Sequence, residues 1–257
     1  MTGAVSSVVA ATGVATLTLC QPQTRNALTP DLLNDLGDAL TAALGDDNVR
    51  LIVMTNEGNT FCAGADLKGG SPTPARYGLV QILQTILDAP KPIVGRIAGH
   101  CMGGGVGLAA ACDISVAAED VLFGFTEARI GVAPAVISVV CLPKMRRADA
   151  SELFLSGERI SAARAVEVGL INRCVPAEEL DAAVSDVAAK VAAGGPEALA
   201  ACKQLIIRVP DMERGDAFTW TEALSARLFA SDEATAGIAA FRSRMAAPWV
   251  ARETPAS

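Results

Sequence analysis

The first part of the chain changes from strand-like alternation to helical spacing. Residues 5–20 carry alternating β-prone positions on both sides of Thr12-Gly13, a pattern that predicts a β-hairpin. Thr29 is the expected N-cap of the helix that follows, with Pro30 at its first position. The helix is predicted by apolar residues at helical spacing, which are Leu32, Leu33, Leu36, Leu40, Ala43 and Leu44.

The middle of the chain alternates short apolar runs with helical segments. A helix is predicted over 75–87, and Pro90 and Pro92 separate it from the next strand. A glycine-rich turn then opens a short, alanine-rich helix over 103–112. The apolar runs of strand length are 50–55, 93–98, 114–117, 121–125 and 170–175.

After about residue 133 the pattern becomes mostly helical. The expected helical pieces are 148–155, 161–168, 178–193, 196–207 and 218–245. Strand-strand-helix units followed by helices predict an α/β fold, in which parallel or mixed sheets pack under helices. We expect a core over 1–200 and a helical C-terminal region over 201–257.

Composition narrows the classes of function. Of the 257 residues, 51% are hydrophobic and 19% are charged, which excludes a disordered chain. The net charge is −7 and no long basic run occurs, so nucleic-acid binding as the main role is excluded, because phosphate contacts need clustered lysines and arginines. The sequence shows neither a secretory signal nor an apolar run of membrane-span length, which predicts a cytoplasmic protein without a membrane partner.

The cysteines and the histidine limit the chemistry further. The 7 cysteines lie in apolar surroundings without C-x-x-C spacing, as expected for reduced, buried thiols. The single histidine, His100, argues against a zinc site, and a histidine-based triad would need His100 itself as the base. We therefore expect no metal and no redox cofactor.

Five segments carry a resemblance when they are taken in order. They are PQTRNAL at 22–28, FCAGADLK at 61–68, IAGHCMGGGVGL at 97–108, FGFTEARIGVAP at 123–134 and the stretch from SGERIS at 156–161 through GLIN at 169–172. Each segment alone is weak, but their order and spacing are specific. Together they resemble the enoyl-CoA hydratase/isomerase (crotonase) superfamily. The resemblance implies the ClpP/crotonase spiral of repeated strand-strand-helix units with a helical C-terminal region.

The resemblance also implies a site for acyl-CoA thioesters. In this family the reaction places negative charge on the thioester oxygen, and two backbone N–H groups form an oxyanion hole, each donor contributing about 2.7–4 kcal/mol. The implied donors are Ala65 and Gly104, the latter at a helix N-terminus that favours negative charge. Loop 69–80 is expected to shape the acyl pocket. The residues expected to bind CoA or substrate are Arg25, Ala63, Asp66, Leu67, Lys68 and Gly103.

The sequence departs from the hydratase pattern at one position. The best-studied hydratases hold a water between two glutamates, and the two positions here are Gly107 and Glu127. Glu127 is the expected general acid/base, because an apolar pocket raises a carboxyl pKa into a useful range. The alternative for Glu127 is an ion pair with a neighbour such as Arg129. His100 could replace the lost group, although a packed structural histidine is favoured.

Three functions stay open at this stage. The residues of the glycine-rich segment and of the FTEARIG segment resemble those of hydratases in the family, which favours hydration of an enoyl-CoA. The single carboxylate favours Δ3,Δ2-enoyl-CoA isomerisation. A non-catalytic acyl-CoA-binding subunit is the third. CoA would enter as part of the substrate.

The apolar stripe over 218–245 needs a partner, and the resemblance implies a homotrimer or a hexamer formed by two trimers.

Overall fold

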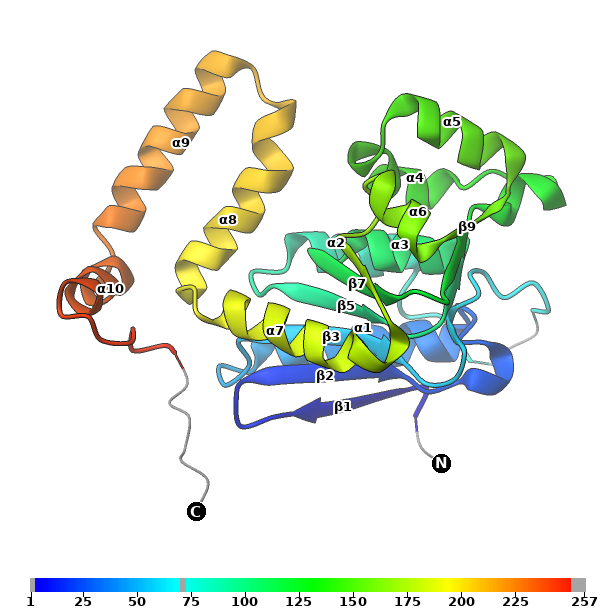
Figure 1. Ribbon diagram of the computed structural model, residues 1–257, viewed down its shortest axis with the longest axis horizontal. Coiled ribbons are helices and arrows are strands. Elements are labelled where there is room, and N and C mark those ends of the chain that lie inside the picture. Colours follow the sequence, from blue (N-terminus) through cyan, green and yellow to red (C-terminus); the bar gives the residue numbers. More distant parts are fainter. Residues whose placement is uncertain (1–2, 70–72, 251–257) are drawn as a thin grey trace.

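The computed structural model describes residues 3–69 and 73–250, and two β-sheets form its centre (Figure 1). The larger sheet has the order β1-β2-β3-β5-β7-β10, and the smaller has the order β4-β6-β8-β9. β1 and β2 pair antiparallel, as do β8 and β9, and the other neighbours are parallel. The strands are β1 Val5–Val9, β2 Val14–Leu19, β3 Leu51–Asn56, β4 Thr60–Cys62, β5 Ile93–Ile97, β6 His100–Met102, β7 Ile114–Ala118, β8 Leu122–Gly124, β9 Arg159–Ser161 and β10 Arg173–Val175.

Helices cover both sheets. α1 packs against β1 and β2, whereas α7 packs against β3, β5 and β7. α3 is buried at every residue because glycines, alanines, valine and leucine surround its whole circumference. The helices are α1 Pro30–Gly45, α2 Leu79–Asp88, α3 Gly104–Ala111, α4 Ala135–Cys141, α5 Arg147–Ser156, α6 Ala162–Glu167, α7 Leu180–Ala192, α8 Pro196–Arg208, α9 Arg214–Phe229 and α10 Asp232–Arg242.

The predicted α/β fold is confirmed, and so is the opening hairpin. Val5 pairs with Leu19 in the antiparallel register of β1 and β2. The Oγ1 of Thr29 accepts a hydrogen bond from the N–H of Leu32 at 3.2 Å, so the expected N-cap of α1 is present. β3 is buried at all of its positions, as expected for a strand with helices on both faces.

Two predicted boundaries are wrong. α2 begins at Leu79 and not at residue 75, because the Oδ1 of Asn34 accepts hydrogen bonds from the N–H groups of Arg76 (2.7 Å) and Tyr77 (3.3 Å). These bonds hold the preceding segment against α1 in a non-helical form. The stretch 218–245 is two helices and not one, since Ser231 caps α10 by accepting from the N–H of Ala234 at 3.0 Å.

The C-terminal helices α8, α9 and α10 form an arm that stands beside the sheets (Figure 1). The base of the arm is fixed by Lys203, whose buried Nζ donates to the Oδ2 of Asp113 at 2.7 Å and to the carbonyl of Ile86 at 3.2 Å. The carboxylate of Glu233 on α10 accepts from the N–H groups of Glu197 and Ala198, which holds α10 against the first turn of α8. None of the helices in the described ranges is long and apolar enough to cross a membrane.

Candidate active site

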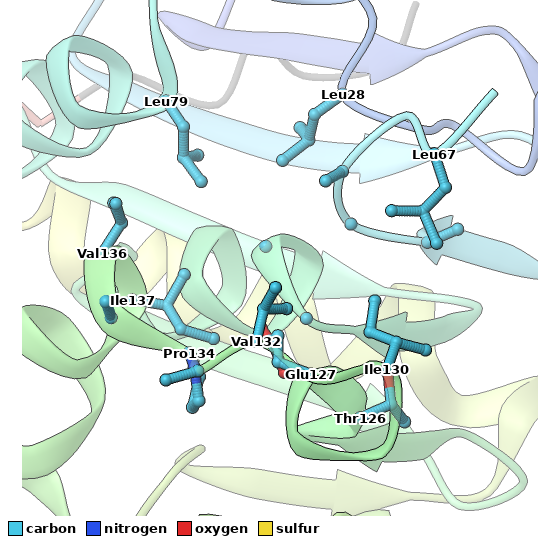
Figure 2. A pocket seen from close by; sticks show the side chains of 17 residues that line it. Leu28, Leu67, Leu79, Thr126, Glu127, Ile130, Val132, Pro134, Val136 and Ile137 are labelled. Carbon is cyan, nitrogen blue, oxygen red and sulfur yellow. The ribbon is translucent and has the colours of Figure 1, made fainter. Parts of the chain in front are cut away.

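One apolar cavity of about 270 Å³ lies where α3, α4 and the loop after β4 meet. Figure 2 shows the side chains around it, and Glu127 is the charged group among them. The lining residues are Leu28, Ala63, Gly64, Ala65, Leu67, Leu79, Gly103, Gly104, Thr126, Glu127, Ile130, Val132, Ala133, Pro134, Ala135, Val136 and Ile137. The cavity therefore brings together four of the sequence segments, those at 22–28, 61–68, 97–108 and 123–134.

Glycines allow two backbone segments to touch at one end of this cavity. A methyl group on Gly105 would lie 2.2 Å from the carbonyl oxygen of Cys62, and one on Gly64 would lie 3.1 Å from the nitrogen of Gly104. Gly64 also has φ +86°, a conformation that other residues rarely adopt. The segment carrying Ala65 and the start of α3 therefore lie in direct backbone contact.

This contact places two N–H groups at the cavity wall. Leu28 donates its N–H to the carbonyl of Gly64 at 2.8 Å and forms a parallel bridge with Ala65. Within the described residues, no backbone hydrogen bond uses the N–H of Ala65 or of Gly104 as its donor. Gly104 is the first residue of α3, where a helix has unpaired N–H groups and a partial positive charge. Both residues line the cavity.

Glu127 stands beside the same glycine turn. It lies in the 3₁₀ turn Thr126–Ile130 that follows β8. A methyl group on Gly103 would lie 3.1 Å from the Oε1 of Glu127, so a side chain at residue 103 would crowd the carboxyl group. The Gly103 N–H donates to the carbonyl of Gly124 at 2.9 Å and fixes the turn against β8. The turn is thus shaped to leave room for the Glu127 carboxyl.

The Glu127 carboxyl lies in an environment that disfavours its charge. Its Oε2 is buried and has no hydrogen-bond partner among the described residues. Burial raises the pKa of Glu127 above the ordinary glutamate value, and a backbone hydrogen bond within the residue lowers it by a smaller amount. The alternative ion pair with Arg129 is wrong, because Glu127 forms no ion pair within the described residues. The Nε of Arg129 instead donates to the carbonyl of Ser156 at 3.1 Å.

The place of a second carboxylate is filled by hydrocarbon. A methyl group on Gly107 would lie 2.3 Å from the Cγ2 of Ile137 and 2.9 Å from its Cβ. Ile137 is buried on α4 and lines the cavity together with Glu127 (Figure 2). Any side chain at residue 107 would thus require Ile137 to move, so one side of the reaction space is apolar.

The expected CoA-binding and substrate-binding residues divide into two groups. Ala63 and Leu67 line the cavity with Gly103, whereas Arg25, Asp66 and Lys68 lie outside its lining. Arg25 and Lys68 are exposed near it, and the carbonyl of Arg25 accepts from the N–H of Ala63 at 3.0 Å. The Oδ1 of Asp66 accepts from the N–H of Lys68 at 3.0 Å, so this carboxylate holds the backbone of its own loop. Of loop 69–80, Leu79 lines the cavity, and residues 70–72 lie outside the described ranges.

Other polar candidates serve the structure. The Nδ1 of His100 accepts from the N–H of Leu122 at 3.1 Å, so this histidine joins β6 to β8 outside the cavity lining. Burial raises the pKa of the Cys62 thiol to about 12, so it stays neutral. Among the described residues, no group of three or more histidine, cysteine, aspartate or glutamate residues is placed to hold a metal ion.

Sequence reasoning missed the apolar wall of the cavity. Thr126, Ile130, Val132, Val136 and Ile137 line it, and two of them belong to α4, which was not predicted. Pro134 directly before the apolar run 135–141 was a usable signal, because proline favours a helix start.

Comparisons with known proteins identify the family. The sequence model of the family described as enoyl-CoA hydratase/isomerase matches residues 10–252. The chain belongs to this family. A relative from Thermus thermophilus is 32% identical over 237 residues, which cover 89% of this chain and 94% of the relative. The predicted crotonase superfamily is therefore confirmed.

Two further members of the enoyl-CoA hydratase/isomerase family carry more specific names. The (E)-benzylidenesuccinyl-CoA hydratase of Thauera aromatica is 31% identical over 241 residues, covering 91% of this chain and 94% of the relative. A solved structure described as an enoyl-CoA hydratase of Mycobacterium smegmatis superposes with a TM-score of 0.88 at 29% identity, covering 96% of this chain and 98% of that one. The fold around the cavity is thus the crotonase fold.

Proposed function

We propose that this enoyl-CoA hydratase/isomerase family member hydrates the double bond of a 2-enoyl-CoA, with Glu127 as its acid–base group. The observation that carries the proposal is the Glu127 carboxyl, whose Oε2 is buried and without a partner among the described residues, in the cavity that Ala65 and Gly104 also line. Donors aimed at a developing oxyanion and a carboxyl with a raised pKa are the two requirements of enolate chemistry. The hydratase names of the relatives support the choice of reaction.

The proposed reaction uses one carboxylate for both proton steps. Water adds its hydroxyl group to C3 while Glu127 accepts the remaining proton. The electrons of the double bond move towards the thioester, and the oxygen carries the charge in the hole formed by Ala65 and Gly104. Glu127 then returns the proton to C2. The apolar lining keeps other water away, which strengthens both the hydrogen bonds and the raised pKa.

Isomerisation is the second candidate, and the contact between Gly107 and Ile137 favours it. A 3-enoyl-CoA would lose a proton from C2 to Glu127 and regain it at C4, with no water consumed. This step needs one carboxylate and a dry cavity. The same two N–H groups would stabilise the enolate.

Turnover of trans-2-hexenoyl-CoA and trans-3-hexenoyl-CoA separates the two reactions. Hydration removes the absorbance of the conjugated 2-enoyl thioester, and isomerisation of the 3-enoyl substrate creates it. We expect hydration that falls about 10²-fold or more in Glu127→Gln, the loss typical of a general acid/base. If the protein converts the 3-enoyl substrate into the conjugated 2-enoyl thioester but does not hydrate it, the reaction is isomerisation instead. Tight binding of both thioesters without turnover would favour the acyl-CoA-binding subunit.

We also propose that the chain assembles as a homotrimer or a hexamer. The arm exposes large apolar side chains, with Phe218 70%, Phe229 73% and Phe241 85% exposed. Large exposed apolar side chains gathered on neighbouring helices are typical of a covered interface. Light scattering of the purified chain tests the assembly, and a monomer at micromolar concentration would overturn it.

A further inference from the structure

The segment 25–28 contacts both parts of the chain that carry the proposed oxyanion donors. Leu28 donates its N–H to the carbonyl of Gly64 at 2.8 Å. A methyl group on Gly104 would lie 2.5 Å from the Cδ1 of Leu28, so this side chain packs directly against the first residue of α3. A change in the position of Leu28 would therefore reach Ala65 and Gly104 together.

The hydrogen bond from Leu28 fixes the direction of the Ala65 N–H. The Gly64 carbonyl and the Ala65 N–H belong to one planar peptide group, and no peptide bond among the described residues is cis. In a trans peptide group the C=O and the N–H point in opposite directions. Because the carbonyl points at Leu28, the N–H points away from Leu28, and Ala65 lines the cavity. A shift of Leu28 would rotate this peptide group and the proposed donor with it.

The backbone before Leu28 has an unusual conformation. Arg25 has φ +57° and Asn26 has φ +51°, so two consecutive residues other than glycine are left-handed. Asparagine visits this region more readily than arginine does. The carbonyl of Arg25 accepts from the N–H of Ala63 at 3.0 Å, so the left-handed turn runs directly into the contact with 63–65. A conformation of this kind persists only where other contacts hold it.

The Asn26 side chain supplies these contacts. It is completely buried, and its Oδ1 accepts from the N–H of Gln21 at 2.7 Å, which closes the turn. Its Nδ2 donates to the carbonyl of Thr60 at 2.8 Å and to that of Glu57 at 3.2 Å, which fastens the turn to β4 and to the loop before it. Asn26 lies outside the cavity lining, so its effect on the site passes through the backbone of 25–28.

We propose that Asn26 is a positioning residue for the oxyanion hole, because its side chain holds 25–28 in the form that directs the Ala65 N–H. The inference rests on the proposed function in one respect, namely that the N–H groups of Ala65 and Gly104 hold the thioester oxygen. The hole acts mainly on the charge that develops during the reaction, so kcat should depend on Asn26 more strongly than KM does.

Steady-state hydration of trans-2-hexenoyl-CoA by Asn26→Gly tests this role. Glycine adopts the left-handed conformation without strain, so the variant removes the side-chain bonds while the backbone form stays allowed. We expect kcat to fall by about 10-fold or more, up to the loss of about 10²–10³-fold that follows from one missing donor, with a much smaller change in KM.

Asn172→Ala is the matched control. The Oδ1 of Asn172 also accepts a backbone hydrogen bond, from the N–H of Ser115 at 2.8 Å, but Asn172 lies outside the cavity lining and contacts β7 instead of the segments around the hole. It should keep the wild-type kcat per folded protein, even where thermal unfolding shows a loss of stability.

Asn26→Asp covers the case in which the glycine variant does not fold. Aspartate keeps the side-chain size and the acceptor for the Gln21 N–H, but it cannot donate to the carbonyls of Thr60 and Glu57 when it is ionised. It should lower kcat in the same direction as glycine. A wild-type kcat in a folded Asn26→Gly or Asn26→Asp protein overturns the assignment, and so does an equal fall of kcat in Asn172→Ala.

The carbonyl stretch of a bound saturated thioester separates this inference from the proposed reaction. Hydrogen bonds from the hole should move the infrared band of hexanoyl-CoA, labelled with ¹³C at the thioester carbon, to lower wavenumber on binding, and no turnover is needed. If no enoyl-CoA is turned over but this shift is present in the wild type and reduced in Asn26→Gly, the reaction is wrong and the positioning role holds. If Glu127→Gln abolishes turnover but Asn26→Gly keeps the wild-type shift and kcat, the reaction holds and the positioning role is wrong.

Discussion

Replacing Gly105 with alanine should break the proposed oxyanion hole without removing any functional group. The new methyl group would lie 2.2 Å from the carbonyl oxygen of Cys62, 2.8 Å from its carbonyl carbon and 2.9 Å from its Cβ. Backbone atoms cannot rotate away, so the loop after β4 and the first turn of α3 must move apart. Because one segment carries Ala65 and the other carries Gly104, the movement separates the two proposed donors.

The expected loss follows from the value of one donor. Removing one oxyanion-hole hydrogen bond costs about 2.7–4 kcal/mol of transition-state stabilisation, which is about 10²–10³-fold in kcat. Overpacking of the buried contact should cost about 1–3 kcal/mol of unfolding free energy. We therefore expect Gly105→Ala to remain folded, because native domains have about 5–15 kcal/mol of stability, and to lose most of its activity.

The assay is kcat for trans-2-hexenoyl-CoA, with thermal unfolding measured on the same samples. Gly45→Ala is the matched control, because Gly45 ends α1 and no atom would lie within 4 Å of the added methyl group. It should keep full activity and gain a few tenths of a kcal/mol, up to about 1 kcal/mol, from better helix propensity. A Gly105→Ala protein with wild-type kcat would refute the proposed oxyanion hole. An equal loss of activity in Gly45→Ala would also refute the reasoning.

Four further predictions concern charge and burial. Because burial raises the pKa of Glu127, kcat/KM for hydration should fall with decreasing pH at values above the ordinary glutamate pKa of about 4.3, and a pH–rate profile measures this. The raised pKa makes the wild type lose stability as pH rises from the ordinary glutamate value through the raised one, so Glu127→Gln should be more stable than the wild type at pH 7 and equal to it at low pH in urea titrations. Lys203→Met should lower the unfolding free energy by about 3 kcal/mol because it leaves Asp113 without its buried partner, whereas Lys190→Met on an exposed pair should change it by less than about 1 kcal/mol. Asn26→Ala should cost about 1–3 kcal/mol by chemical denaturation, since the buried Asn26 amide accepts from the N–H of Gln21 and donates to the carbonyl of Thr60.

The sequence predicted most reliably those structural features that depend on a short, local pattern of residues. The cap at Thr29 and the fully buried strand β3 were predicted because each depends on a local pattern. The segments around Ala65, Gly104 and Glu127 were recognised from their order in the chain. That they line one cavity required the structure, because the contact between them depends on glycines that are close only in space.

Short elements were missed for a physical reason. β4, β6 and β9 have three residues each, too few for an alternation to be visible. α4 has seven residues and follows a loop, and its apolar run could equally have been a strand. Missing α4 mattered for the site, because Ile137 lies on this helix. Gly107 alone indicated a missing carboxylate, but the sequence did not show that Ile137 packs against this position.

The central claim is that the Glu127 carboxyl moves the proton at C2 of a thioester whose oxygen is held by two backbone N–H groups. Hydration of trans-2-hexenoyl-CoA in D₂O, followed by NMR of the product, tests it most directly. The account predicts one deuterium at C2 in the wild-type product and a rate of incorporation reduced at least about 10²-fold in Glu127→Gln with unchanged thioester binding. Incorporation at the wild-type rate in Glu127→Gln would contradict the account, because another group would then carry the proton.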